Sequence, residues 1–222
     1  MTSPAAAGCG ASRGRRAGAG LYTALAGLFF GVNTAQLLFL PTAARAAGLG
    51  SLGVGIVIAV FTGIGVLTDL PASELANRRG VPVTMLIGCA LTVAGTAFFL
   101  AGQRAWSVLA GALVLGIGTS FLMNPILGGL SNLAGDNQLA WQLANVCVQR
   151  AGGLIAIVAL TAGGVSGPVP QGAWASVAGT AVIAVIALRL RPGDRAARRP
   201  APAGPPAPAR QPAPARRPAA AG

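Results

Sequence analysis

Residues 52–70 read LGVGIVIAVFTGIGVLTDL, nineteen residues in which Asp69 is the single charge. About 17–25 apolar residues are enough to cross the hydrocarbon core of a bilayer as a helix. Because lipid offers the backbone no hydrogen-bond partner, such a run folds as an α-helix in a membrane. The stretch therefore predicts a membrane-spanning helix. Five further runs of the same character lie at 21–40, 81–101, 106–123, 139–163 and 173–190.

The composition points the same way. Of the 222 residues, 54% are hydrophobic and only 9% are charged, whereas a soluble domain carries about a quarter charged residues. We therefore predict an all-α membrane protein whose six transmembrane helices occupy residues 21–190. Residues 1–20 are small, polar and basic, and in 191–222 all but Asp194 and Gln211 are Ala, Pro, Arg or Gly. Both tails are predicted to be disordered.

The first apolar run is predicted to be a retained helix and not a cleaved signal peptide. A basic segment precedes it, and Ala44-Arg45-Ala46 resembles a small-residue cleavage site. The run is about 20 residues long, however, whereas the apolar part of a signal peptide has 7–15. Five more spans also follow it.

The arginines predict the orientation of the chain. All sixteen cationic residues are Arg, and cytoplasmic loops carry an excess of basic residues. With both termini in the cytoplasm, thirteen arginines lie inside, Arg45 and Arg104 lie outside, and Arg150 lies within a span. We therefore expect a multi-pass protein of the cell membrane with cytoplasmic N- and C-termini.

Several function classes are disfavoured by what the spans contain. The net charge of +12 would suit a nucleic-acid binder, but no segment places basic and aromatic residues on one face, so the expected partner is the lipid bilayer. The three cysteines (Cys9, Cys89 and Cys147) have no metal-ligand spacing. The absence of His excludes His-based catalytic sites, and the spans hold no pair of carboxylates. We expect no enzyme activity, no cofactor and no metal site.

The connection between the second and third runs carries a motif. It reads DLPASELANRRG, residues 69–80. This resembles the loop motif of the major facilitator superfamily, Pro-x-Gly-x-Leu-Ala-Asp-Arg-x-Gly-Arg-Arg, which lies in the cytoplasmic loop between helices two and three. The residues that match in register are Pro71, Leu75, Ala76, Arg78 and Gly80.

Three positions depart from that motif. Ser73 replaces its Gly, Asn77 replaces its Asp, and Val81-Pro82 replaces the final arginine pair. The loss of the Asp removes an anion that in this family helps to lock the outward-open state. The fourth run also lacks the family's buried Arg. Residues 163–168 read GGVSGP, which resembles part of a motif of proton-coupled exporters, although a helix-ending Gly-Pro turn explains it equally well.

The resemblance implies a fold and a function. Six spans with inside termini correspond to the amino-terminal half of a major facilitator, which contains two three-helix inverted repeats. The implied function is secondary transport of an unidentified small solute by alternating access, with efflux as one direction. Because six helices enclose half a cavity, we expect a partner, either a second copy or a separately encoded second half. The implied conformational gate consists of Asp69, Pro71, Asn77, Arg78 and Gly80.

A charged residue within a span is the next candidate. Arg150 lies in the fifth run, and a charge at the bilayer centre costs at least about 2.5–3.5 kcal/mol. Four amide side chains precede it at helical spacing and share one helical face, which Arg150 adjoins. One interpretation is a hydrated substrate path in which Arg150 attracts an anion. The other is a seam of hydrogen bonds between helices. The four amides are Gln138, Gln142, Asn145 and Gln149.

Three more polar residues in the spans are candidates for the substrate path. Asn33 and Gln36 lie in the first run and Asn124 ends the fourth, and in the resembling family the first and fourth helices line the cavity. Asp69 lies near the predicted cytoplasmic end of the second helix. There it is expected to anchor the interface or to contact Arg78, and the alternative is a proton-carrying acid.

One alternative interpretation of the whole chain stays open. The weakened motif and the unusual composition of 191–222 favour a truncated or degenerate relative that does not transport. Such a protein would act as a scaffold for other membrane proteins or would have no activity.

Overall fold

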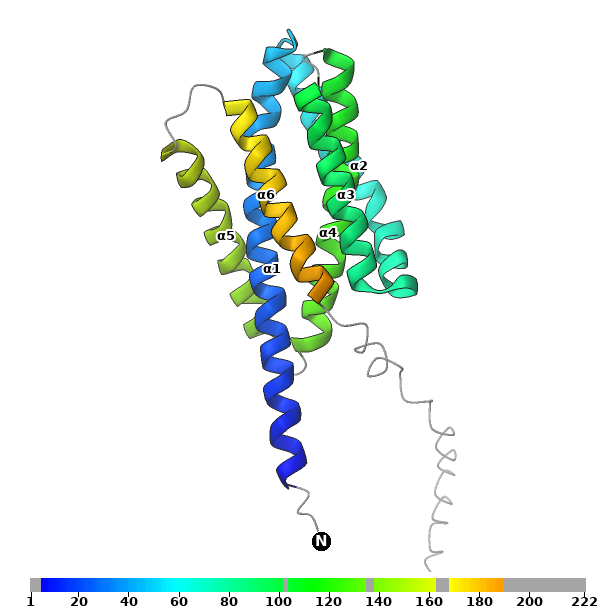
Figure 1. The fold of residues 1–222 in the computed structure, drawn as a ribbon, viewed down its shortest axis with the longest axis vertical. Coiled ribbons are helices and arrows are strands. Elements are labelled where there is room, and N and C mark those ends of the chain that lie inside the picture. The colour runs from blue at the N-terminus through cyan, green and yellow to red at the C-terminus, as the bar shows by residue number, and fades with distance from the viewer. Residues whose placement is uncertain (1–4, 102–103, 135–137, 163–167, 190–222) are drawn as a thin grey trace, which may run out of the picture. The chain divides into compact units, whose positions relative to one another are not determined.

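The computed structural model describes residues 5–101, 104–134, 138–162 and 168–189 (Figure 1). Over these residues the predicted all-α fold is confirmed. Five of the helices are long and apolar enough to cross a membrane, so the chain is a multi-pass membrane protein. The helices are α1 (Ala5–Ala46), α2 (Ser51–Arg79), α3 (Val81–Ala101), α4 (Ala105–Ala134), α5 (Gln138–Ala162) and α6 (Pro168–Arg189).

Three helices extend well beyond the apolar runs that predicted them. α4 continues to Ala134, so Asn124, predicted at the end of the fourth span, lies inside the helix. α1 begins at Ala5, whereas the sequence assigned residues 1–20 to a tail. This part of α1 is rich in Ala, the strongest helix former, so the helix extends beyond the apolar run. α2 continues through the segment that the sequence assigned to a loop, and Pro71 lies inside the helix. Residues 163–167, part of the exporter-like motif, and the tail 191–222 lie outside the described residues.

The turn between α2 and α3 consists of Gly80 alone. Its backbone has φ 92° and ψ 159°, and its N–H donates a hydrogen bond of 3.0 Å to the carbonyl of Ala76. Only glycine adopts this conformation without strain. The motif residue Gly80 therefore sets where α2 stops and α3 begins.

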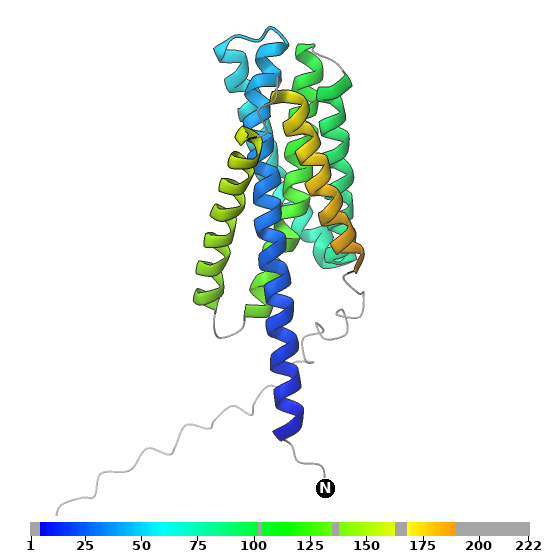
Figure 2. The same ribbon diagram turned by 60° about the vertical axis from the view of Figure 1, so that its left-hand side comes forward.

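The packing of the helices follows a simple scheme. α1 contacts α4, and α3 contacts α6. In addition, α3 packs on α4 and α6 packs on α1. α2 packs mainly on α4, and α5 packs mainly on α1. Figure 2 shows α5 on one side of α1 and α6 with α3 on the other. α3 and α6 therefore cover one side of the pair α1 and α4. We call the other side, which α2 and α5 border, the open face.

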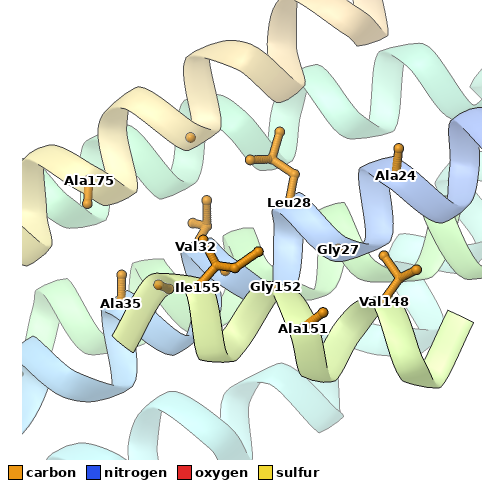
Figure 3. A pocket seen from close by; sticks show the side chains of 13 residues that line it. Ala24, Gly27, Leu28, Val32, Ala35, Val148, Ala151, Gly152, Ile155 and Ala175 are labelled. Atoms are coloured by element: carbon orange, nitrogen blue, oxygen red, sulfur yellow. The ribbon is translucent and has the colours of Figure 1, made fainter. Parts of the chain in front are cut away.

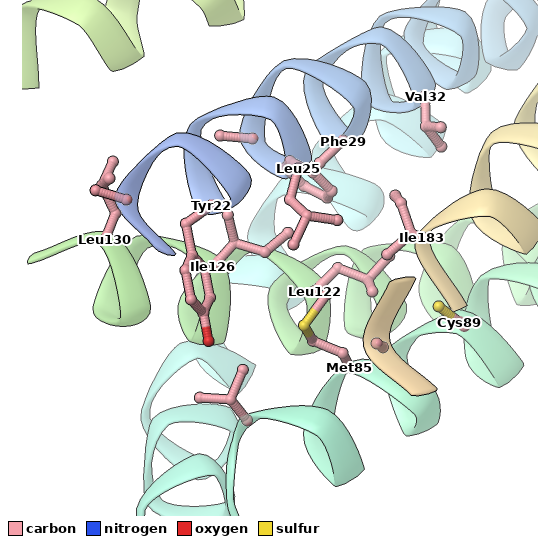
Figure 4. Close-up of a cluster of buried hydrophobic side chains, with 14 residues drawn as sticks. Tyr22, Leu25, Phe29, Val32, Met85, Cys89, Leu122, Ile126, Leu130 and Ile183 are labelled. Carbon is pink, nitrogen blue, oxygen red and sulfur yellow. The ribbon is translucent and has the colours of Figure 1, made fainter. Parts of the chain in front are cut away.

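Two apolar cores hold this arrangement together. The first lies where α1, α3, α4 and α6 meet, and Phe29, Met85, Leu122 and Ile183 are buried in it (Figure 4). The second joins α1 to α2, α3 and α4 around Phe39 and Phe99, whose rings pack edge to face at 5.3 Å. Among the described side chains, none of those on α5 belongs to either core, so the packing of α5 depends on other contacts.

Glycines bring α3 onto α4 and α6 onto α1 in the same way. A Cβ on Gly88 or Gly95 of α3 would meet Leu122 or Leu115 of α4 at 2.9 and 2.8 Å. On α6, a Cβ on Gly172 would lie 2.8 Å from Phe39 of α1, and one on Gly179 would meet Val32. The two glycines of each helix are seven residues apart, and so are the residues that they contact. Helices approach this closely in membranes where small residues line the contact.

Candidate functional site

A buried amide joins three helices near the middle of the bundle. Gln36 of α1 is 2% exposed, and its Nε2 donates a hydrogen bond of 3.0 Å to the hydroxyl of Ser176 on α6. Its Oε1 lies 3.5 Å from the hydroxyl of Thr119 on α4, which donates to the carbonyl of Leu115 at 2.9 Å. Buried polar groups are normally paired in this way. Gln36, a candidate for the substrate path, is therefore used in joining helices.

A second polar contact joins α2 to α4. Asn124 Nδ2 donates to Asp69 Oδ1 at 2.7 Å and to the carbonyl of Ser120 at 3.1 Å. One turn further along both helices, the hydroxyl of Ser120 donates to the carbonyl of Gly65 at 2.7 Å. The candidate Asp69 thus pairs with Asn124 across the helix interface.

The rest of the predicted gate lies at the end of α2. Arg78 forms an ion pair with Glu74 one turn before it, and both side chains are exposed. Pro71 and Asn77 are also exposed. The structure therefore separates the gate residues. Asp69 lies in the helix interface, Pro71 lies two residues further along inside α2, and Asn77 and Arg78 lie close to the turn at Gly80.

Three side-chain oxygens are buried and lack a hydrogen-bond partner within the described part of the chain. One is Oγ1 of Thr92 on α3, and the other two are the Oδ1 atoms of Asn33 on α1 and Asn145 on α5. Asn145 is only 7% exposed. A buried acceptor without a partner costs stability, so each one calls for an explanation such as a bound water or solute. Both asparagines were candidates for the substrate path.

α5 presents its amides towards α1. Asn145 is buried and Gln149 is half-buried, whereas Gln142 is exposed and the side chain of Gln138 lies outside the described ones. Arg150 is exposed, and within the described residues no hydrogen bond or ion pair engages it. The shared face of Asn145 and Gln149 therefore faces the bundle, and Arg150 lies beside it on the surface.

The backbones of α1 and α5 touch at two glycines. A Cβ added to Gly152 would collide with the carbonyl oxygen of Gly27, and one added to Gly27 would lie 3.4 Å from the carbonyl oxygen of Val148. A Cβ on Gly31 would lie 3.3 Å from the carbonyl oxygen of Gly152. Small residues thus make up for the absence of the described α5 side chains from the two apolar cores.

A groove of about 650 Å³ lies where α1, α5 and α6 meet (Figure 3). All thirteen residues that line it are Gly, Ala, Val, Leu or Ile. It holds no side chain that donates or accepts a hydrogen bond, so it suits hydrocarbon and not a polar solute. None of the predicted path residues lines this groove.

Three polar residues of these contacts were not predicted from the sequence: Thr119, Ser120 and Ser176. One pattern in the sequence could have indicated Ser120. Ser120 and Asn124 are four residues apart on α4, as Gly65 and Asp69 are on α2, so each pair lies on one face of its helix. No comparable spacing marks Ser176.

Comparison of the chain with models of known families, with curated proteins and with solved structures finds no match.

Proposed function

We propose that this chain is half of a secondary transporter of the major facilitator type, which moves a small solute across the cell membrane by alternating access. The observation that carries the proposal is the matched packing of α3 on α4 and of α6 on α1. The glycine spacing is the same in both contacts. α2 also lies on α4 as α5 lies on α1. Exchanging α1–α3 with α4–α6 therefore reproduces the scheme of contacts.

The directions of the helices support an inverted repeat. Along α1 and α4 the contacts run in opposite order, because Tyr22 lies against Gly129 and Gln36 lies beside Thr119. Two three-helix units related in this way have opposite orientations in the membrane. Inverted repeats of this kind are common in secondary transporters, whose substrate sites lie near the repeat interface.

The sixth span in this proposal is α5. Its described apolar part is Gln142–Val158. It also carries Asn145, Gln149 and Arg150, as expected of a helix that faces a hydrated path and not lipid alone. The arginine distribution supports cytoplasmic termini.

The proposed path lies on the open face between α2 and α5. Asn33 and Asn145 supply acceptor oxygens that lack partners in the described chain. Gln142 and Gln149 supply further amides, and Arg150 supplies a positive charge. Such a set would hold a small polar or anionic solute, whereas Gln36 and Asp69 hold the helices that frame it.

A test that needs no substrate is labelling from either side of the membrane. In a chain that carries Cys9→Ser and Cys147→Ser and keeps only the buried Cys89, we would add one thiol at a time by Asn33→Cys or Gln149→Cys. A membrane-impermeant thiol reagent should reach both positions from the cytoplasmic side and from the opposite side, because alternating access hydrates the path from each in turn. Val182→Cys, at an exposed apolar position of α6, is the matched control and should stay unlabelled.

Labelling from neither side would overturn the proposed path and would favour the alternative of a non-transporting scaffold. If the path is labelled, vesicles that contain the full chain can be screened with radiolabelled organic anions and neutral solutes. Arg150→Ala should then abolish transport at unchanged protein level. Unchanged transport would remove Arg150 from the mechanism.

A further inference from the structure

Arg150 lies on the flank of α5 that faces away from α6. Ala151 and Ile155 line the groove shared with α6, while Gln149 faces the bundle. Because successive residues of a helix are 100° apart, Arg150 lies on the flank opposite to that groove. Its guanidinium is exposed in a helix of apolar surroundings. A charge in such a place is normally paired or hydrated.

The chain offers few anions to pair with it. Of its four acidic residues, Asp69 and Glu74 lie in the described segments, both on α2. Glu74 already pairs with Arg78 in its own helix. Asp69 accepts one amide N–H, from Asn124, and a carboxylate has room for several donors. Of the two acidic residues in the described segments, Asp69 is therefore the one better suited to a further cation.

Asp69 and Arg150 lie at the same level of the bundle. Gly27 of α1 lies against Val148 and Gly152 of α5, so Arg150 is level with Gly27. The contacts of Tyr22 with Gly129 and of Gln36 with Thr119 place Gly27 opposite the part of α4 that contains Asn124. Asn124 in turn binds Asp69.

Within one chain these two residues belong to opposite edges of the open face. α2 packs mainly on α4 and α5 mainly on α1, with α1 and α4 between them. A second copy, related by a two-fold axis parallel to the helices, would place its α5 beside α2 and its α2 beside α5. Such an axis preserves depth, so only residues at equal levels meet across it, and an isologous interface contains each contact twice.

We propose that a second copy of this chain docks on the α2/α5 face, with Asp69 of each copy bound to Arg150 of the other. Apolar side chains surround both residues: Val66, Leu67 and Leu70 are 71–82% exposed next to Asp69, and Leu143, Val146 and Leu154 are 50–62% exposed around Arg150. Packed together they would shield one side of each ion pair from water and so strengthen it, while the other side of Arg150 borders the proposed path. The inference rests on the proposed function in one respect, since the second copy would complete the half cavity.

Charge exchange tests the pair directly. The full chain, purified in detergent, should dimerise, and Asp69→Asn or Arg150→Gln should raise the dimer dissociation constant at least about tenfold. Asp69→Arg should abolish the dimer, and the double variant Asp69→Arg/Arg150→Asp should restore it. Circular dichroism and melting in detergent identify variants that fail to fold. A monomeric parent, unaffected single variants or a folded double variant that stays monomeric would each overturn the proposal.

Crosslinking in native membranes gives a second, independent measurement. The exposed thiol of Cys147 lies one turn from Arg150, and Leu70→Cys adds a thiol next to Asp69. In a Cys9→Ser background, an oxidant should join position 70 of one copy to Cys147 of the other. The control Leu188→Cys, also at an exposed apolar position but on α6, should give no such dimer. Equal crosslinking of both variants, or of neither, would overturn the proposed face.

Neither readout measures transport, so the two proposals fail separately. A dimer that uses these residues but shows no hydrated path keeps the interface and removes the transporter. A hydrated path in a strictly monomeric chain keeps the transporter and removes the interface.

Discussion

The side-chain amide of Asn124 on α4 donates a hydrogen bond of 2.7 Å to the carboxylate of Asp69 on α2. This contact joins α2 to α4, the helix on which α2 mainly packs. It lies one turn from the bond between Ser120 and Gly65. Together the two bonds fix the register of α2 along α4.

Removal of the Asn124 amide should loosen this interface. We expect Asn124→Ala to lower the free energy of unfolding by about 1 kcal/mol, the usual size of a hydrogen bond between membrane helices. Unfolding by SDS in mixed micelles measures the change. Thr62→Ala is the control, because the hydroxyl of Thr62 donates to the carbonyls of Ile58 and Ala59 in its own helix. Equal losses of unfolding free energy in the two variants would show that the bond between Asn124 and Asp69 adds no stability beyond that of a bond within one helix.

The crossing of α1 and α5 should not accept a methyl group. Gly152→Ala would drive its Cβ into the carbonyl of Gly27, and overpacking of this kind costs about 1–3 kcal/mol. Gly63→Ala has nothing within 4 Å of the added methyl group, so it should gain up to about 1 kcal/mol of helix propensity. Thermal unfolding in detergent should therefore move in opposite directions for the two variants. A stabilised Gly152→Ala would contradict the close approach.

The unpartnered oxygen of Asn145 should cost stability that an apolar side chain recovers. Asn145→Leu is expected to raise the free energy of unfolding by about 1–3 kcal/mol, since it removes a buried acceptor that lacks a partner in the described chain. The same change should reduce transport if Asn145 binds solute. Gln36→Leu, at a paired position, should not raise stability. A loss of stability in Asn145→Leu would show that the oxygen is already satisfied.

The turn at Gly80 should be intolerant of any side chain. At φ 92° and ψ 159°, an L-residue is strained by about 1–3 kcal/mol, so Gly80→Ala should lower the melting temperature. Gly50→Ala, at φ −70°, should cost clearly less. Differential scanning fluorimetry compares the two, and equal shifts would contradict the backbone conformation at Gly80.

The helices could be predicted from the sequence because their apolar runs are long and bear few charges. The ends of the helices could not be predicted. α1 extends into a polar segment that is rich in Ala, and α2 continues its helical hydrogen bonding through a polar segment up to Arg79. Pro71 is an example. It was assigned to a loop, yet it lies in α2, as a proline within a membrane helix is tolerated where neighbours satisfy the freed carbonyl.

The candidate site was predictable in its residues but not in its pairings. Of the four amides of α5 that the spacing placed on one face, Asn145 is buried and Gln149 is half-buried, whereas Gln142 is exposed. Which of the polar side chains are paired depends on lateral neighbours, however, and no local pattern encodes them. Gln36 and Asn33 illustrate this, because they lie three residues apart on α1 but only Gln36 finds a partner on another helix.

The single-residue turn at Gly80 also bears on how the protein is made. α2 and α3 together form a stretch of about 50 residues with no slack between the two helices. We expect neither helix to enter the bilayer alone, because its neighbour is drawn in with it before the turn clears the translocon. Arg78 and Arg79, next to the turn, would then keep the tip of this hairpin on the side from which the ribosome supplies the chain.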